Sequence, residues 1–316
     1  MNKTGFLYDE RFLKHITSSY HPERPERLTA ILSGIEKADL LPKLIKINAE
    51  SADMKWIELV HEKSYIERFK TACLNGQTIF DCMDNSICKD TYDTAVLAVG
   101  GILKTCDMLM EGVIDNAFCA VRPPGHHAEV SEGMGFCYFN NVAVLARYMQ
   151  SKWGIKKVGI IDIDVHHGNG TQHIFEQEPD IFYYSIHEHP SFAYPGTGRE
   201  FETGKDEGEG FTKNNPILPG ADINHYKKTL QKDCLPAFKE FKPEVFIIST
   251  GFDAHKDDDM SDINLSTEGF SWIMNEIVKM ADKYANGRII SVLEGGYSLK
   301  RLGELAENHV KILINI

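Results

Sequence analysis

Short apolar segments alternate with longer amphipathic segments along this chain, and no other feature constrains its fold as strongly. The apolar segments have the length of strands and lie at residues 6–8, 117–121, 158–163, 181–186, 245–249 and 289–293. Consecutive apolar positions are typical of parallel strands that are buried on both faces. Between them, apolar residues recur with helical spacing, for example at 25–38, 54–73, 91–110, 140–152 and 267–284. The pattern predicts an α/β fold with an open, mostly parallel β-sheet flanked by helices on both faces.

The chain shows no sign of division into several domains. Its 316 residues contain no linker rich in Pro, Gly or Ser, no low-complexity tract and no internal repeat, so we predict one domain over residues 1–316. The amino-terminal stretch MNKTGFLYDERFLKH lacks the apolar core of a signal peptide, and no run approaches the ~18 apolar residues of a membrane span. We expect a cytoplasmic protein, or a nuclear one if the source is eukaryotic, without membrane contact.

Charge and cysteine content exclude further classes of protein. A formal net charge of -12 argues against direct binding of nucleic acid through a general electrostatic footprint. The seven cysteines are scattered, odd in number and include no C-x-x-C pair. Reduced, packed thiols fit this pattern better than a disulfide framework or a cysteine-based zinc site. The sequence carries no signal for an oligomeric state.

Polar side chains suited to metal and proton chemistry follow five of the predicted strands. They lie in the loops at residues 122–127, 162–167, 185–189, 251–255 and 294–297. Ligands of parallel α/β sheets bind outside the carboxyl ends of the strands, where such loops meet. The sequence therefore predicts a site resembling that of a metal hydrolase at this edge of the sheet.

The segment DIDVHHGNGT, which follows the apolar run at 158–161, offers two metal ligands. On an extended chain Asp162, Asp164 and His166 share one face, so Asp164 and His166 can chelate one ion. A catalytic zinc needs three protein ligands and an open position, and Asp253 in TGFDAH is the best third ligand. The D-x-H pattern alone would also fit a surface turn or a helix cap, but its place after a buried strand favours a metal site.

Proton transfer is assigned to His126 and His127, in a loop stiffened by two prolines. Asp162 and Asn169 can orient them, one partner to each imidazole, and an ionised and a neutral partner would hold the two pKa values apart. Tyr297 follows two glycines that let the backbone pass close to a ligand. Its phenol could donate to an oxygen that becomes negative in the transition state, although a tyrosine here could also simply fill the core.

Seven motifs along the chain carry a resemblance to a known family. They are HPERPER at residues 21–27, RPPGHHA, GFCYFNN, DIDVHHGNGTQ, YPGTGR, TGFDAH and LEGGYSL. Block by block they resemble the zinc-dependent histone deacetylase and acetylpolyamine amidohydrolase family, over roughly residues 6–299. Asn169, together with GFDAH, resembles the class II branch of that family.

The resemblance implies a role for each matching residue. Asp164, His166 and Asp253 would hold one catalytic zinc ion, for which Fe2+ can substitute. His126 and His127 would be the tandem acid/base histidines, backed by Asp162 and Asn169, and Tyr297 the oxyanion donor.

Further positions resemble the substrate-binding and structural residues of the family. The carbonyl of Gly135 would accept the substrate amide hydrogen, and Phe136 and Tyr194 would wall the acyl-lysine tunnel. Arg27 would line an acetate exit channel, and Asp84 would be a carboxylate at the tunnel rim. Main-chain oxygens around Asp162, Asp164 and His166, with the side chain of Ser185, would bind a structural potassium ion.

The function expected from these residues is zinc-dependent hydrolysis of acyl groups, above all acetyl, from N-ε-acyl-lysine in a protein or peptide. An acetylpolyamine deacetylase is the alternative, but the substrate-facing position where such specialists can carry Glu is here Met260. The neighbouring Asp257, Asp258, Asp259 and Asp262 fit a solvated acidic loop better than a polyamine trap.

Two more distant functions fit the sequence less well. A binuclear manganese hydrolase of the arginase type uses D-x-H-x-D, and Gly168 stands where its second carboxylate would lie. A pseudo-deacetylase that only binds acylated ligands would lack a metal ligand, a tandem histidine or the tyrosine. All of these are present.

Overall fold

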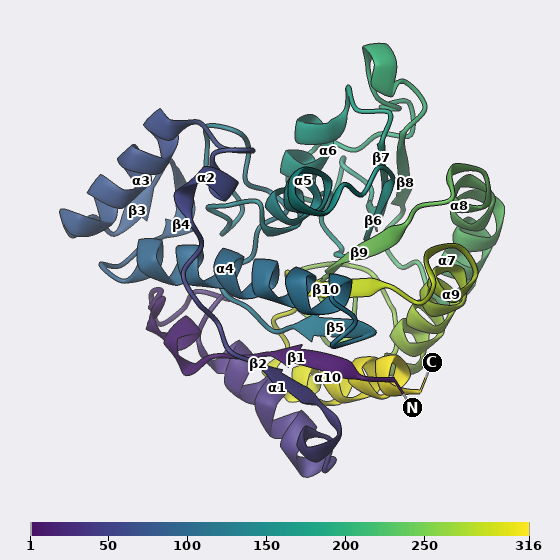
Figure 1. Cartoon of the computed structure of the whole chain (residues 1–316), viewed down its shortest axis with the longest axis horizontal. Coiled ribbons are helices and arrows are strands. Elements are labelled where there is room, and N and C mark those ends of the chain that lie inside the picture. The colour runs from purple at the N-terminus through teal and green to yellow at the C-terminus, as the bar shows by residue number, and fades with distance from the viewer. Residues whose placement is uncertain (1, 316) are drawn as a thin grey trace.

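A single parallel β-sheet forms the centre of the molecule. The computed structural model describes residues 2–315, and within them the sheet has 8 strands in the order β2-β1-β5-β10-β9-β6-β7-β8 (Figure 1). Every neighbouring pair is parallel. The strands are β1 (Thr4–Leu7), β2 (Ile45–Ile47), β5 (Asn116–Cys119), β6 (Val158–Asp162), β7 (Ile181–Glu188), β8 (Thr212–Ile217), β9 (Val245–Thr250) and β10 (Ile289–Leu293). The predicted fold class is confirmed.

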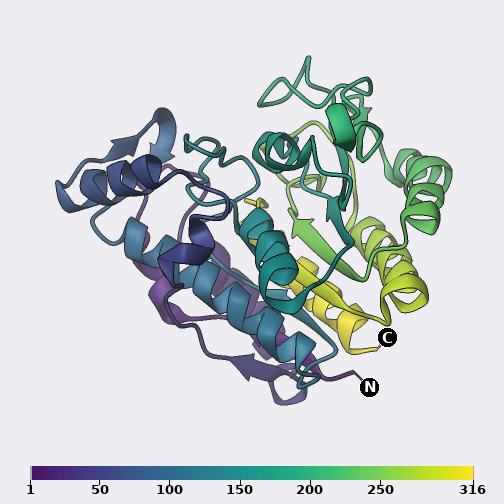
Figure 2. The ribbon, with the colours of Figure 1, turned by 45° about the horizontal axis from the view of Figure 1, so that its top comes forward.

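Helices cover both faces of the sheet. α4 (Thr91–Met110) and α5 (Asn141–Trp153) pack together over one face, and α1 (Glu26–Lys37), α9 (Thr267–Ala285) and α10 (Leu299–Ile314) cover the other (Figures 1 and 2). The remaining helices are shorter: α2 (Met54–Ile57), α3 (Lys63–Leu74), α6 (Asn169–Phe175), α7 (Ile223–Thr229) and α8 (Leu235–Phe241). With both faces covered, all residues of β6 and β10 are buried, which explains their consecutive apolar positions.

Strand register aligns the loops that carry the polar motifs. Asp162, the last residue of β6, pairs with Ser185 of β7 on one side and with Ser249 of β9 on the other. Leu293, at the end of β10, pairs with Thr250 at the end of β9. The loops after β6, β9 and β10 therefore leave the sheet at the same level, which brings their side chains together.

Two edge strands and one hairpin are absent from the sequence prediction. β2 has only three residues, and β8 reads TKNNPI, which is polar and contains Pro216, as edge strands often do. β3 (Ile79–Phe80) and β4 (Cys82–Ser86) form an antiparallel hairpin separate from the main sheet. None of these segments has the apolar run from which the buried strands were predicted.

The helix predicted over 54–73 is wrong as one element, because it divides into α2 and α3. Glu62 has extended dihedral angles at the start of α3, and its N–H donates to the carbonyl of Val130 at 3.0 Å. His61 is buried, and its Nε2 accepts a hydrogen bond from the Asn140 N–H at 2.9 Å. Contacts with the loop before α5 interrupt the helix, and helical periodicity does not report such contacts.

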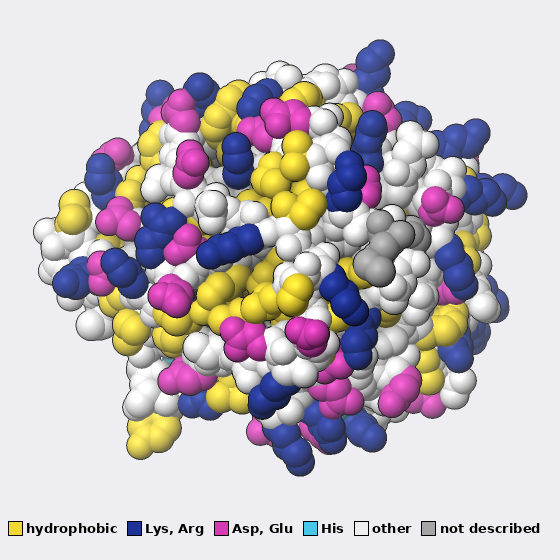
Figure 3. All heavy atoms as spheres, turned by 60° about the horizontal axis from the view of Figure 1, so that its bottom comes forward, with side chains coloured by type: hydrophobic (Ala, Val, Ile, Leu, Met, Phe, Trp, Pro, Cys, Tyr) yellow, Lys and Arg dark blue, Asp and Glu magenta, His cyan; other side chains and the backbone are white. Residues whose placement is uncertain are grey.

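All seven cysteines are free thiols in the structure. On the face that Figure 3 draws, Lys and Arg side chains are interspersed with Asp and Glu side chains. Among residues 2–315, no helix combines the length and the apolar character that crossing a bilayer would require.

Candidate active site

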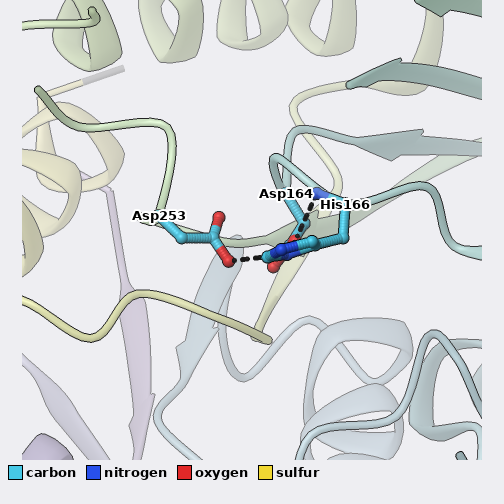
Figure 4. Close-up of side chains that lie close together, drawn as sticks. All are labelled: Asp164, His166 and Asp253. Carbon is cyan, nitrogen blue, oxygen red and sulfur yellow. Dashed lines mark hydrogen bonds and ion pairs between the residues drawn. The ribbon is translucent and has the colours of Figure 1, made fainter. Parts of the chain in front are cut away.

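Asp164, His166 and Asp253 converge from the loops after β6 and β9 (Figure 4). One ligand atom from each lies within 4.8 Å of the others, and all three residues are buried. His166 Nδ1 is 3.2 Å from Asp164 Oδ1 and 3.3 Å from Asp253 Oδ2. Although burial opposes it, His126 and His166 hold the pKa of Asp164 well below its usual range. The three side chains thus form a buried, anionic donor set.

The remaining contacts of this donor set leave one oxygen for a cation. Asp164 Oδ2 accepts a hydrogen bond from the Gly295 N–H at 2.8 Å, and Asp253 Oδ1 accepts one from the Val165 N–H at 3.0 Å. Asp253 Oδ2 is buried and, among residues 2–315, accepts no well-formed hydrogen bond; the group facing it is His166 Nδ1 at 3.3 Å. Such an oxygen is costly to bury unless a partner compensates it. Two carboxylates and an imidazole fit a divalent ion such as zinc, with one position open.

Gly295 allows the backbone to approach this donor set. A Cβ at this position would lie 2.0 Å from Asp253 Oδ2 and 2.7 Å from Asp164 Oδ2. No side chain fits in that space, so only glycine can bring its N–H to Asp164. This close approach is the one expected from the glycine pair before Tyr297.

His126 faces a carboxylate. Its Nδ1 lies 3.0 Å from Asp162 Oδ2, and its Nε2 lies 3.8 Å from Asp164 Oδ1. Asp162 also accepts hydrogen bonds from the Tyr183 hydroxyl at 3.0 Å and from the Asp164 N–H at 3.1 Å. Burial alone would lower the pKa of His126, but Asp162 and Asp164 raise it to about 10. The two carboxylates therefore favour the imidazolium form of this ring.

His127 faces an amide. Its Nδ1 lies 2.7 Å from Asn169 Oδ1, while Asn169 Nδ2 donates to Glu129 Oε1 at 2.5 Å. Because the amide nitrogen points to Glu129, its oxygen must accept from His127 Nδ1–H, which leaves Nε2 with a free lone pair. Burial lowers the pKa of His127 well below its usual value, and the charges of His126 and His166 lower it further. This imidazole is neutral and poised as a proton acceptor.

Glu294, which sequence reasoning missed, binds the backbone of the loop that carries the tandem histidines. Its Oε2 accepts hydrogen bonds from the N–H groups of Gly125 at 2.7 Å and His126 at 3.1 Å. The Ser249 hydroxyl donates to its Oε1 at 3.2 Å. Burial raises the pKa of Glu294 to about 7. A glutamate at the end of an otherwise apolar strand was the available signal.

Tyr297 is held beside this centre by Arg27. The Arg27 guanidinium carbon lies 4.8 Å from the centre of the tyrosine ring, and its nitrogens donate to the carbonyls of Gly296 at 2.6 Å and Glu294 at 2.5 Å. Burial raises the pKa of Tyr297 well above its usual value. The phenol therefore keeps its proton and can donate it in a hydrogen bond.

The two aromatic residues expected to wall a tunnel lie against the candidate catalytic residues. The ring centres of Phe136 and Tyr297 lie 6.0 Å apart and those of Tyr194 and His127 lie 5.0 Å apart, and both pairs meet edge to face. Gly135 packs so closely on His127 that a Cβ would lie 2.3 Å from its ring. Phe136 has a positive φ of 68°, and Asn85 Oδ1 accepts from its N–H at 2.7 Å. Asn85 is a second residue that sequence reasoning missed.

Asp84 and Ser185 are placed near the site but outside its centre. Asp84 is half-buried, and its carbonyl accepts a hydrogen bond from His21, whose ring lies 4.6 Å from that of Phe136. Ser185 pairs with Asp162 in the sheet, and its hydroxyl lies 2.7 Å from His187 Nδ1. Their roles at a rim and at a potassium site stay predictions.

The loop that contains Met260 differs from expectation. Met260 is half-buried, and its N–H donates to Asp258 Oδ1 at 3.1 Å. Asp257, Asp259 and Asp262 are exposed, as a solvated loop requires, but Asp258 is 6% exposed. The prediction of a solvated acidic loop is wrong for Asp258, because backbone N–H groups bind its carboxylate inside the protein.

Together these groups can activate water and stabilise an oxyanion. A candidate cation site, two imidazoles with pKa values shifted in different directions and a phenol that keeps its proton follow strands β5, β6, β9 and β10 at the carboxyl edge of the sheet. Such a set is suited to hydrolysis of an amide or ester by a metal-activated water.

Comparison with known proteins assigns this site to a family. Residues 21–313 match the model of the histone deacetylase domain. A probable deacetylase of Archaeoglobus fulgidus is 35% identical over 94% of this chain and 82% of its own length. A histone deacetylase-like amidohydrolase of Pseudomonas aeruginosa is 32% identical over the same shares. The crystal structure of the HDA15 HD domain superposes with a TM-score of 0.94, at 35% identity over 99% of this chain and 88% of that one.

Proposed function

Because this chain belongs to the histone deacetylase family, we propose that it is a zinc-dependent amidohydrolase that removes acyl groups from N-ε-acyl-lysine. The observation that carries the proposal is the convergence of the buried Asp164, His166 and Asp253, beside two imidazoles of which one faces a carboxylate and the other an amide. The three residues would hold one zinc ion, or Fe2+ in its place, and Asp162 and Ser185 would contribute to a structural potassium site. When bound, the catalytic ion lowers the pKa of water toward 7 and polarises a carbonyl.

His127 and His126 have different parts in the proposed reaction. His127 Nε2 takes the proton of the attacking water and later delivers a proton to the amine that leaves. His126 stays charged and stabilises the negative charge that develops nearby, since Asp162 holds it as an imidazolium.

Tyr297 would donate its hydroxyl hydrogen to the substrate oxygen as that oxygen becomes negative. Its raised pKa keeps the proton in place, and Arg27 and Phe136 restrict its ring. Tyr297→Phe is expected to lower kcat by about two to three powers of ten, the usual cost of losing an oxyanion donor.

Acyl-lysine is the favoured substrate because of the residues around the entrance. Phe136 and Tyr194 offer aromatic surfaces that suit an aliphatic lysine stem, and the Gly135 carbonyl would accept the substrate amide hydrogen. By the motif resemblance, Met260 occupies the position where an acetylpolyamine deacetylase can carry Glu. An acetylpolyamine is the second candidate, since the exposed Asp259 and Asp262 and the net charge of -12 favour a cation.

A binuclear manganese site is disfavoured by geometry as well as by motif. A Cβ at Gly168 would lie 2.4 Å from Asp162 Oδ2 and 3.1 Å from His126 Nδ1. A bridging carboxylate therefore has no room at that position. Metal analysis of the purified protein should give one tightly bound divalent ion per chain.

The decisive experiment compares substrates and removes the metal. Hydrolysis of acetyl-lysine peptides is measured beside that of N-acetylputrescine and N-acetylcadaverine, with and without a chelator, followed by re-addition of zinc. We expect faster turnover of the peptides, loss of all activity with chelator and recovery with zinc. Faster cleavage of the diamines would replace the proposed substrate, and undiminished activity of the metal-free protein would refute the proposed mechanism.

A further inference from the structure

The Asp258 carboxylate is buried between two loops of the site. It lies five residues after the metal-ligand candidate Asp253, and Ser261 Oγ of the same loop donates to the Asp253 carbonyl at 2.8 Å. Asp258 Oδ2 accepts hydrogen bonds from the N–H groups of Tyr297 at 2.6 Å and Ser298 at 2.8 Å. Its Oδ1 accepts from the Met260 N–H at 3.1 Å. One side chain therefore joins the loop after β9 to the loop after β10.

These three hydrogen bonds fix the carboxylate in one place. A buried charge is expensive unless it is hydrogen-bonded, and bonds from N–H groups to a carboxylate are roughly twice as strong as neutral ones. α10 begins at Leu299, and the side chain of its N-cap Ser298 makes no capping hydrogen bond. The N–H groups at a helix start need partners from elsewhere, and Asp258 supplies one from a different segment.

Tyr297 needs such an anchor because of the two residues before it. Gly295 and Gly296 precede it, and Gly296 has a φ of 109°, so the chain has little intrinsic preference for one direction there. Arg27 binds the Gly296 carbonyl and stacks on the tyrosine ring. Asp258 binds the N–H on the other side of the same peptide unit, so the two residues clamp the backbone of Tyr297.

We propose that Asp258 is a positioning residue for the reaction: its carboxylate holds the Tyr297 backbone so that the phenol hydroxyl reaches the substrate oxygen. The inference rests on the proposed role of Tyr297 in deacylation. It assigns Asp258 no contact with the substrate or the metal.

The test measures Asp258→Asn in two backgrounds, the natural enzyme and Tyr297→Phe. An asparagine has one oxygen and no negative charge, so its bond to the Tyr297 N–H is weakened when that oxygen faces Tyr297 and Ser298, and both of those bonds are lost when the NH2 group faces them. In the natural background kcat on an acetyl-lysine peptide should fall about tenfold with KM within about twofold, because transition-state contacts are affected more than binding. In the Tyr297→Phe background the same substitution should change kcat by less than about twofold, because the coupled residues act through one hydroxyl.

Asp257→Asn is the matched control. Asp257 is the neighbouring acidic residue, and its Oδ2 pairs with Arg301 Nε at 2.6 Å, away from Tyr297. This control should leave kcat within about twofold in both backgrounds, as surface pairs contribute little. Metal content and urea unfolding are measured on every variant. If Asp258→Asn does not fold, Asp258→Glu, which keeps the charge but displaces it by one methylene, is measured in the same two backgrounds.

The outcomes separate this inference from the proposed function. An equal loss of kcat in both backgrounds, or loss of bound metal, would overturn it, because Asp258 would then act through the fold or through Asp253. Full activity of Tyr297→Phe alone would refute the oxyanion role itself, and the positioning role with it. If Tyr297→Phe is impaired but Asp258→Asn lowers kcat further in that background, by the same factor as in the natural enzyme, only the positioning role of Asp258 is refuted.

Discussion

His126 and His127 are adjacent in sequence and their ring centres lie 4.0 Å apart, yet they occupy two different electrostatic environments. The Nδ1 atom of His126 faces the Asp162 carboxylate, and that of His127 faces the Asn169 amide. The pKa of the first is raised to about 10, and that of the second is well below its usual value. The carboxylates of Asp162 and Asp164 raise the pKa of His126, whereas burial and the charges of His126 and His166 lower that of His127, so two identical side chains have different charge states.

The charge of one histidine also increases the difference between the two pKa values. The positive charge on His126 is one of the causes that lower the pKa of His127. Two interacting imidazoles titrate together, so any change of partner on one side alters the other. Substitutions of the partners consequently test the division of labour more sharply than substitutions of the rings alone.

The largest expected effect comes from removing each ring in turn. His127→Ala should lower kcat by about three powers of ten, the range of a lost general acid–base group, whereas His126→Ala should lower it by roughly one to two. Steady-state kinetics on one acetyl-lysine peptide, with metal content as the control, measure both. Equal losses would mean that the two rings share proton transfer, which would contradict the different roles assigned to His126 and His127.

Asp162→Asn should give the next largest effect. The change removes the charge that keeps His126 protonated, so the pKa of His126 falls and its positive charge is lost near neutral pH. Losses of about ten- to a hundredfold in kcat are typical for such supporting residues. Tyr183→Phe is the matched control, because it removes a hydrogen bond to Asp162 and leaves the carboxylate in place. A loss as large in the control would show that packing around Asp162, not its charge, matters.

Asn169→Asp would give His127 the kind of partner that His126 has. A carboxylate at this place favours the imidazolium, so the pKa of His127 rises. Because the base must be neutral to accept a proton, the acidic limb of the pH–rate profile should move to higher pH, by about one to two units. Rates across pH 5 to about 9 measure the shift. A limb that stays in place, or moves to lower pH, would contradict His127 as the base.

The sequence predicted the sheet and the candidate ligand set because both depend on local patterns. Apolar runs predict buried strands, and the D-x-H spacing places two side chains on one face at a strand end. The first two ligands need no knowledge of distant contacts, and Asp253 is predicted because parallel strands end at the same edge of the sheet. The nearness of Asp162 to His126 and of Asn169 to His127 was also expected, since few other partners follow neighbouring strands.

The supporting carboxylates could not be predicted in the same way. Glu129 and Asp258 are ordinary acidic residues in sequence, and what distinguishes them is the amide or N–H group that the fold brings to each one. Glu294 stands out in sequence at the end of an apolar strand, but its contacts with the N–H groups of Gly125 and His126 do not. Asp258 lies among exposed aspartates, so composition suggested the opposite environment. Long-range contacts decide which member of an acidic run is buried, and no local pattern records them.

Glu129 gives the smallest expected effect on the environment of His127, because its contact with Asn169 is one residue removed from the ring. Its Oε1 accepts from Asn169 Nδ2 at 2.5 Å and lies 2.8 Å from His173 Nδ1. Glu129→Ala removes the acceptor that fixes the amide orientation, so Asn169 could turn its NH2 group toward His127 and oppose the Nδ1–H tautomer. A loss of about three- to fivefold in kcat is expected, because the Glu129–Asn169 contact acts on His127 indirectly and roughly 1 kcal/mol is at stake.

Two further variants decide whether that loss comes from orientation or from charge. Glu129→Gln keeps an oxygen that can accept from Asn169 Nδ2, so it should recover most of the activity if orientation matters. His173→Ala removes the other partner of Glu129 and should change kcat by less than about twofold, because the Asn169 contact survives. If the glutamine variant is as impaired as the alanine variant, the negative charge of Glu129 is what His127 senses. Both histidines would then respond to a carboxylate. They would differ only in how far that carboxylate lies from the ring, since Asp162 contacts His126 directly and Glu129 lies behind Asn169.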